Sequence, residues 1–279
     1  MQLILQHSRT TILYRQVMRN LRGIIGGLMI LLLLVMAIFG PALAPHGPDD
    51  MNLRSRLAAP AFMDMASSDN YLLGADQLGR DLYSRIIYGA RISVAIGILS
   101  VLLGMVVGVT LGLVAGYFGG LTEDLIMRLA DIQLSLPFIL VAILTMSIFG
   151  SGFWMIVFIL ALSSWVGFTR VTRGEVLAIK EQEFVHAVTS VGASHLRIMF
   201  RHILPNVASS IIVIATLRIA NNILLEASLT FIGVGLSPDI PAWGSMLAEG
   251  RDYFTSAWWI ATFPGIAIMI PTLGFNLLG

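Results

Sequence analysis

The sequence predicts an all-α integral membrane protein with six transmembrane helices, and three observations indicate this class. Of the 279 residues, 57% are hydrophobic and only 12% are charged, about half the charged fraction of a soluble domain. The mean hydropathy is +0.85. Six apolar segments are long enough to cross a bilayer as helices, which takes about 20 residues each. Lysine and arginine are distributed unevenly among the segments that connect them.

The composition also excludes several classes of protein. The net charge of +1 gives no reason to expect a nucleic-acid partner. The chain has no cysteine, and the spacing of His186, His195 and His202 does not match common structural zinc patterns, so we expect no metal site. No Gly-Lys-Ser/Thr loop occurs, so the chain does not bind ATP by that route. We therefore expect no cofactor in this chain.

The chain divides into an N-terminal anchor region and a larger core. Residues 1–22 form a tail, 23–44 the first transmembrane helix and 45–91 an external segment. The first apolar run is longer than the core of a signal peptide, which indicates a retained anchor. Residues 92–279 form a core domain of five further transmembrane helices. A polar loop at 181–205 lies within this domain. We place these spans near 92–115, 125–149, 153–170, 206–229 and 255–278.

Positive charge predicts the orientation of these spans. Arginines and no acids precede the first span, at Arg9, Arg15, Arg19 and Arg22, so we expect a cytoplasmic N-terminus. Six spans return the C-terminus to the cytoplasm. The loop between the fourth and fifth spans is rich in basic residues and falls on the cytoplasmic side, whereas the loop between the fifth and sixth is acidic and falls outside.

The cytoplasmic loop contains the stretch EFVHAVTSVGASHLRIMFRHILP, from Glu183 to Pro205. Apolar residues recur at helical spacing up to Ser190, and Gly192 then supplies a turn. Ser194 suits the N-cap of a second short helix that runs through Arg201. Helices this short are marginal in water, so they need a surface to pack against. That surface is the membrane, the protein's own helix bundle or a partner protein.

This stretch resembles the cytoplasmic EAA loop of the permease subunits of binding-protein-dependent ABC importers. Two further stretches, LLGADQLGRDLYSRIIYGARIS and EASLTFIGVGLSPDIPAWGSMLAEGR, resemble the peptide and nickel branch of that family. The resemblance covers residue 20 onward and is closest to the "C"-type subunit. The EAA positions that fit are Ala187, Gly192, Leu204 and Pro205, and those that depart are His186, Val188 and His202.

The resemblance implies a type I ABC importer permease (MetI-like) fold and a transport function. Such a subunit moves di- or oligopeptides across the bacterial cytoplasmic (inner) membrane by alternating access; nickel chelates, glutathione or another small solute are alternatives. It is not an enzyme, because two partner ABC ATPases use the ATP and Mg. The other implied partners are a second homologous permease, an extracytoplasmic solute-binding protein and membrane lipid. Related chains usually continue past FNLLG with a short acidic and basic tail, whereas this sequence stops at Gly279, which leaves truncation there an open question.

Three groups of candidate site residues follow. The resemblance assigns contact with the ATPase to one group within the cytoplasmic loop: Glu183, Phe184, His186, Ala187, Gly192, Ala193, Leu196 and Arg197. A polar stripe in the fifth span lines the translocation path or the permease interface, or else holds the bundle together: Arg218, Asn221, Asn222 and Glu226. Candidate contacts for the binding protein on the outer surface are Arg80, Asp81 and Trp243.

A membrane-embedded enzyme and an ion channel are the alternatives to a permease. An enzyme needs polar catalytic groups that face one another inside the spans, and the polar groups found lie on one helix, so we assign no catalytic residue. A channel needs a filter repeat or rings of charge, and the sequence has neither. Co-purification of ATPase subunits would decide among the three.

Overall fold

The computed structural model describes the backbone of residues 2–63 and 71–279 and the side chains of residues 21–63 and 71–279. Residues 64–70 of the predicted external segment, and the side chains of the tail arginines before residue 21, lie outside the described residues. The long helices are α1 (Gln2–Leu43), α2 (Leu82–Phe118), α3 (Gly120–Ser135), α4 (Phe138–Phe149), α5 (Phe153–Lys180), α8 (Leu204–Phe231) and α10 (Trp259–Leu278). The short elements are η1 (Leu53–Ser55), η2 (Ala61–Met63), α6 (Glu183–Ser190), α7 (His195–Arg197), the π-helical η3 (Ile198–Ile203) and α9 (Trp243–Arg251).

The all-helical membrane class is confirmed. In the described part of the chain, five helices are long and apolar enough to cross a membrane, and α3 with α4 makes a sixth if the pair is one span. The expected continuous helix over 125–149 is wrong, because α3 and α4 meet at an angle of 86°. Pro137 explains the break: Leu136, the residue before it, has extended backbone (φ −94°, ψ 128°), as steric clash with a following proline requires.

α2 begins at Leu82 rather than near residue 92, because Asp81 caps its N-terminus. The Asp81 carboxylate accepts hydrogen bonds from the backbone N–H groups of Tyr83 (3.3 Å) and Ser84 (3.1 Å). Such a cap satisfies amides that have no partner inside the helix. The segment before α2 is therefore shorter than predicted, and α2 runs unbroken from the end of the bundle that carries α9 to its other end.

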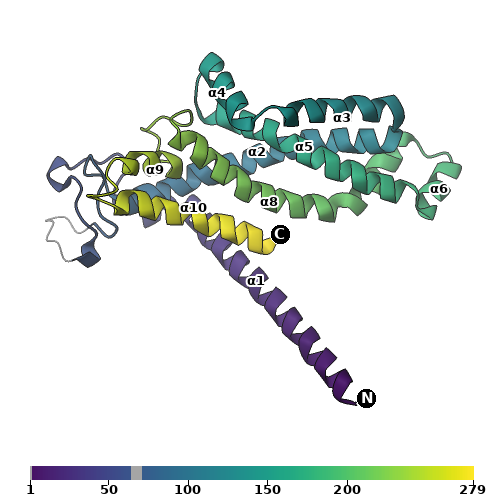
Figure 1. Cartoon of the computed structure of the whole chain (residues 1–279), viewed down its shortest axis with the longest axis horizontal. Helices are drawn as coiled ribbons and strands as arrows, with labels where there is room; N and C mark the ends of the chain where they lie inside the picture. The colour runs from purple at the N-terminus through teal and green to yellow at the C-terminus, as the bar shows by residue number, and fades with distance from the viewer. Residues whose placement is uncertain (1, 64–70) are drawn as a thin grey trace.

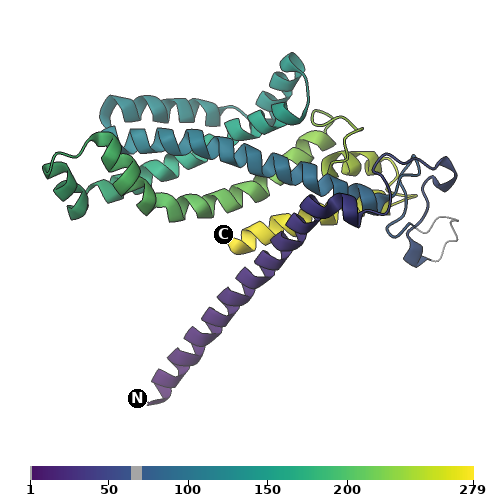
Figure 2. The same ribbon diagram turned by 180° about the vertical axis from the view of Figure 1, so that it is seen from behind.

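Glycines on α2 allow it to pack closely against α5. Gly104, Gly108, Gly112 and Gly116 recur every fourth residue and are buried. A Cβ added at Gly112 would lie 2.5 Å from the carbonyl oxygen of Thr169 on α5, and additions at the other three would also collide with α5. Small residues at this spacing let membrane helices approach backbone to backbone. The two helices lie side by side in Figures 1 and 2.

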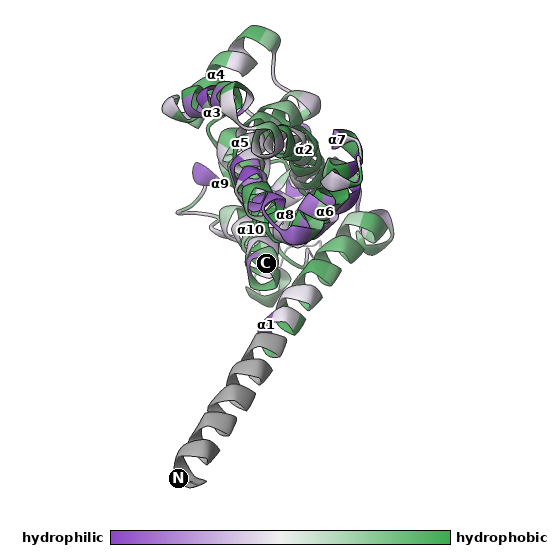
Figure 3. Ribbon diagram, turned by 90° about the vertical axis from the view of Figure 1, so that its right-hand side faces the viewer, coloured by the Kyte–Doolittle hydropathy of each residue, from purple (hydrophilic) through white to green (hydrophobic). Residues whose placement is uncertain are grey.

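The bundle has two distinct ends (Figure 1). One end gathers α9 and the segment before α2, and the other carries α6. α1 contacts the bundle through its second half, where Gly26 meets Gly274 of α10, and its first half projects away. Seen from the α6 end, hydrophilic residues gather on α6 and the neighbouring helix ends, whereas α2 and α4 are mainly hydrophobic on their sides (Figure 3). This pattern fits a bundle embedded in lipid.

Candidate functional site

The segment α6–Gly192–α7 forms a projecting unit, which we call the knob (residues 183–197). α6 ends in a Schellman motif: Gly192 N–H donates to the Thr189 carbonyl (2.9 Å), and Ala193 N–H donates to the Val188 carbonyl (3.4 Å). Gly192 has φ +83°, a left-handed conformation that glycine adopts without strain. The predicted turn between two helical pieces is therefore present, and its geometry depends on Gly192.

The knob has one buried face and one uncovered face. Val185 is 3% exposed and packs in a cluster with Ile198 and Met199. On the outer side Val191 is 89% exposed, Leu196 64% and Phe184 38%, so three apolar side chains of this short unit are left uncovered by the chain. Of the candidate coupling residues, Ala193 is half-buried, and the following are exposed: Glu183, Phe184, His186, Ala187, Gly192, Leu196 and Arg197.

The second half of the knob differs from the prediction in one respect. A separate helix through Arg201 was expected, whereas α7 is one short turn that continues through η3 into α8. Ser194 occupies the N-cap position with extended backbone, but its side chain makes no capping hydrogen bond. Residues 195–231 therefore form one continuous helical segment, in which the π-helical η3 lies between α7 and α8.

A contact missed by the sequence analysis joins the knob to α2. The Tyr117 hydroxyl lies 2.8 Å from Nδ1 of His195, and the two rings meet edge to face with centroids 5.6 Å apart. Phe118 packs on the same imidazole at 6.0 Å. The knob is thus attached to α2 as well as to α8.

The polar stripe of α8 separates into residues with different surroundings. Asn222 is buried: its amide nitrogen donates to Oγ of Ser100 on α2 (2.8 Å) and Oγ of Ser164 on α5 (3.1 Å). Glu226 is also buried and accepts hydrogen bonds from Ser93 on α2 (3.2 Å) and from Thr230 (3.1 Å). The bonds to Ser93, Ser100 and Ser164 cross between helices, which supports the reading of Asn222 and Glu226 as residues that hold the bundle together.

The other two members of the stripe are not enclosed in this way. Asn221 is exposed, and Arg218 is half-buried. The guanidinium of Arg218 lies over Gly167 of α5, where an added Cβ would come within 3.0 Å of Cζ. Arg218 and Asn221 therefore remain candidates for the translocation path or the permease interface.

The three candidate contacts for the binding protein are buried within this chain. Arg80 is 4% exposed, Asp81 2% and Trp243 1%. Asp81 caps α2, and Nε1 of Trp243 donates to the carbonyl of Ile86 (3.0 Å). The expectation that these side chains form an outer docking surface is therefore contradicted, because each is used to hold α2 against its surroundings.

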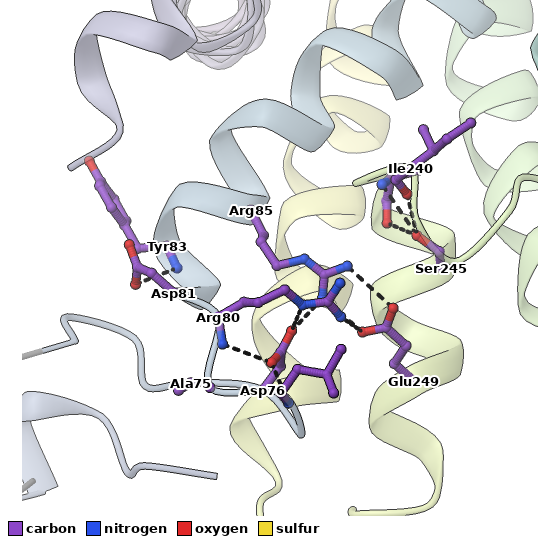
Figure 4. Close-up of polar contacts among 12 residues, drawn as sticks. Ala75, Asp76, Arg80, Asp81, Tyr83, Arg85, Ile240, Ser245 and Glu249 are labelled. Carbon is purple, nitrogen blue, oxygen red and sulfur yellow. Dashed lines mark hydrogen bonds and ion pairs between the residues drawn. The ribbon is translucent and has the colours of Figure 1, made fainter. Parts of the chain in front are cut away.

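Arg80 belongs to a buried ion cluster at the end of the bundle that carries α9 (Figure 4). Nε of Arg80 lies 2.6 Å from Oδ2 of Asp76, and its Nη2 lies 3.0 Å from Oε2 of Glu249. Arg85 contacts the same two carboxylates at 2.6 Å and 2.7 Å through Nη1. Two cations and two anions thus join the segment before α2, α2 itself and α9.

The sequence analysis missed Asp76, Arg85 and Glu249 as members of this cluster. The sequence did contain a signal, because Arg80 and Arg85 flank the start of a helix that is buried. Buried arginines require carboxylates nearby. The carboxylate of Glu249 is far along the chain, however, and spacing cannot identify it.

Two families of known proteins match this chain. A model of the "Binding-protein-dependent transport system inner membrane component" matches residues 108–279, and a model of the "N-terminal TM domain of oligopeptide transport permease C" matches residues 8–60. The first covers more than half of the chain. The second falls on α1 and the segment after it.

Curated relatives agree with these families. The chain is 41% identical to the di/tripeptide transport system permease protein DppC of Pseudomonas aeruginosa, over 92% of this chain and 85% of that protein. It is 41% identical to the glutathione transport system permease protein GsiD of Pectobacterium atrosepticum, over 95% of this chain and 86% of that protein. The chain therefore belongs to the inner-membrane components of binding-protein-dependent transport systems, in the peptide and nickel branch of the ABC importer permeases, with their MetI-like helical fold.

Proposed function

We propose that this chain forms half of the path through which an ATP-driven importer moves di- or oligopeptides across the bacterial cytoplasmic membrane by alternating access. Similarity to a di/tripeptide permease supports peptides as the substrate class. Similarity to glutathione permeases makes glutathione the main alternative. Nickel chelates are a weaker alternative within the same branch. As a member of a permease family, the chain is a non-catalytic subunit.

The single observation that carries the coupling role is the uncovered apolar face of the knob. Val191 and Leu196 are exposed on a unit that lies beyond the lipid-facing part of the bundle. A groove in a partner protein would remove these side chains from water, and helix-in-groove binding uses such a face. We assign that groove to a cytoplasmic ATPase, which uses ATP and Mg, and we place residues 183–197 at the contact.

The remaining partners follow from the family. A second homologous permease completes the path, two ATPases engage the two knobs, and an extracytoplasmic solute-binding protein delivers the solute. If the knob binds an ATPase, its end of the bundle is cytoplasmic, and the end that carries α9 and the ion cluster is external. The N-terminus and the end of α10 then face the cytoplasm, in agreement with the arginine distribution.

The knob is tested with the variants Gly192→Val and Ala187→Trp in the whole transporter. Gly192→Val introduces a β-branched residue at φ +83°, where side chains are strained, and Ala187→Trp adds bulk on the exposed face. Neither position lies in the lipid-facing part of the bundle. We expect normal amounts of permease in the membrane, a loss of about tenfold or more in ATPase co-purification, and a matching loss of uptake.

Two matched controls make this test specific. Gly192→Asn places at the same position a residue that tolerates the left-handed conformation, so it should retain most of the ATPase. Ser237→Trp adds the same bulk at an exposed position at the other end of the bundle and should leave ATPase binding unchanged. Full ATPase retention in both knob variants would refute the coupling role of residues 183–197.

A further inference from the structure

Arg218 carries the positive charge of the α8 stripe, and the described part of the bundle leaves that charge unmatched. Among the described residues, none forms a hydrogen bond or an ion pair with its guanidinium, whereas Asn222 and Glu226, one and two turns farther along α8, are bonded to α2, α5 or α8. Arg218 is half-buried, so part of the guanidinium remains open. An arginine inside a spanning helix requires a partner or water.

Lipid headgroups are too far away to supply that partner. Arg218 lies near the middle of α8, about 20 Å from Leu204 and from Phe231 at 1.5 Å per residue. Snorkelling serves arginines near helix ends, where the side chain reaches the interface. The guanidinium at this depth must therefore face the interior of the assembled transporter.

The position of the guanidinium is fixed by shape. Gly167 of α5 provides the space, since a Cβ there would overlap Nη2 of Arg218 and lie 3.0 Å from its Cζ. The carboxylate of Asp131 on α3 is paired with Arg170 of α5. It therefore does not neutralise Arg218. The seam between α5 and α8 thus holds a positioned, uncompensated positive charge.

We propose that Arg218 is a carboxylate-binding site in the translocation path. Its guanidinium pairs transiently with the carboxylate of the transported solute. This inference rests on the proposed import of peptides or glutathione, since both carry a free carboxylate at neutral pH. The planar guanidinium matches a carboxylate with two parallel hydrogen bonds. Because the site is partly open to water, the pair is weak enough to release the solute, as a conducting path requires.

The first test measures uptake by the reconstituted transporter, with its second permease, ATPases and binding protein. The solutes are dialanine and glutathione. We expect Arg218→Gln to lower uptake of the imported solute about tenfold, and Arg218→Lys, which keeps the charge but not the fork, to lower it less. Assembly and ATPase stimulation by the loaded binding protein should remain within about twofold, so that more ATP is hydrolysed per solute.

The second test restores the charge chemically. The chain has no cysteine, so Arg218→Cys gives one thiol in this subunit, and cysteine-free partners keep it unique. Cationic aminoethyl methanethiosulfonate should restore uptake, anionic sulfonatoethyl methanethiosulfonate should not, and an excess of solute should slow both reactions. Ser237→Cys, at an exposed position after α8 and outside the polar stripe, is the control and should show no dependence on the sign of the reagent.

Each outcome decides a different point. If the wild-type transporter imports neither dialanine nor glutathione, import of dipeptides and of glutathione is wrong, and the inference fails with it. If the wild type imports one of them but uptake by the Arg218 variants is normal or insensitive to the sign of the reagent, only the inference fails. If Arg218→Gln instead lowers pairing with the second permease, the arginine pairs with an acid of that subunit, and the carboxylate-binding site is likewise refuted.

Discussion

The hydroxyl of Tyr117 lies 2.8 Å from Nδ1 of His195, which joins the end of α2 to the start of α7 across a separation of 78 residues. α2 is unbroken from Leu82 to Phe118, and its first turn carries Arg85 of the external ion cluster. The proposed coupling can therefore act on α2 as well as on α8. The contact is small, so its effect is expected on coupling and not on folding.

Tyr117→Phe removes the hydroxyl and keeps the ring. A hydrogen bond of this kind contributes about 0.5–1.5 kcal/mol, so we expect uptake to fall by a factor of about 2–10 while the ATPases still co-purify. Uptake and ATP hydrolysis are measured together in proteoliposomes. Tyr253→Phe, at the external end, is the control and should behave as wild type. Unchanged uptake in Tyr117→Phe would show that the bond is not part of the coupling.

Arg85→Ala should destabilise the transporter strongly. The substitution leaves Asp76 and Glu249 with less compensation in a buried site, and breaking such a pair costs about 3–5 kcal/mol. The control is Arg251→Ala, because Arg251 pairs with Asp252 on the exposed surface, where a pair contributes about 0–1 kcal/mol. Thermal unfolding of the purified complex, followed by tryptophan fluorescence, measures both. Equal melting temperatures would contradict a structural role for the cluster.

Gly108→Ala should weaken the contact between α2 and α5. An added Cβ would collide with the backbone at Trp165 and with Phe168, and overpacking of this kind costs about 1–3 kcal/mol. Gly174→Ala on α5 is the matched control, since nothing lies within 4 Å of a Cβ there and alanine is the better helix former. The same melting assay should move in opposite directions for the two variants. A stabilised Gly108→Ala would mean that the helices can separate freely.

The orientation predicts which introduced cysteines a membrane-impermeant thiol reagent can reach. Ser190 on the knob and Ser237 after α8 are both exposed, and the chain has no cysteine of its own. In intact cells we expect Ser237→Cys to be labelled from outside and Ser190→Cys only after the membrane is opened. Ser237→Cys should retain uptake, because its side chain is exposed and lies away from the knob. Labelling of Ser190→Cys in intact cells would reverse the orientation and remove the basis for ATPase coupling.

Local properties of the sequence determined the helices and the turn of the knob. Long apolar runs predict spans because every backbone polar group in lipid must bond within its own helix. Gly192 predicts the end of α6 because a left-handed residue at that point favours glycine. The break between α3 and α4 is also local, since Pro137 forces Leu136 to be extended, although hydropathy alone suggested one continuous span.

Only the tertiary structure decided which polar residues meet. Asp131 pairs with Arg170 on another helix and not with Arg128, three residues away on its own helix. Arg85 and Glu249 are 164 residues apart, and Trp243 bonds to the backbone of Ile86. Composition shows that charges in a low-dielectric interior require partners, but the choice of partner depends on which helix faces approach. The same packing encloses Asn222 and leaves Arg218 open, a difference between two residues one turn apart that no helical pattern contains.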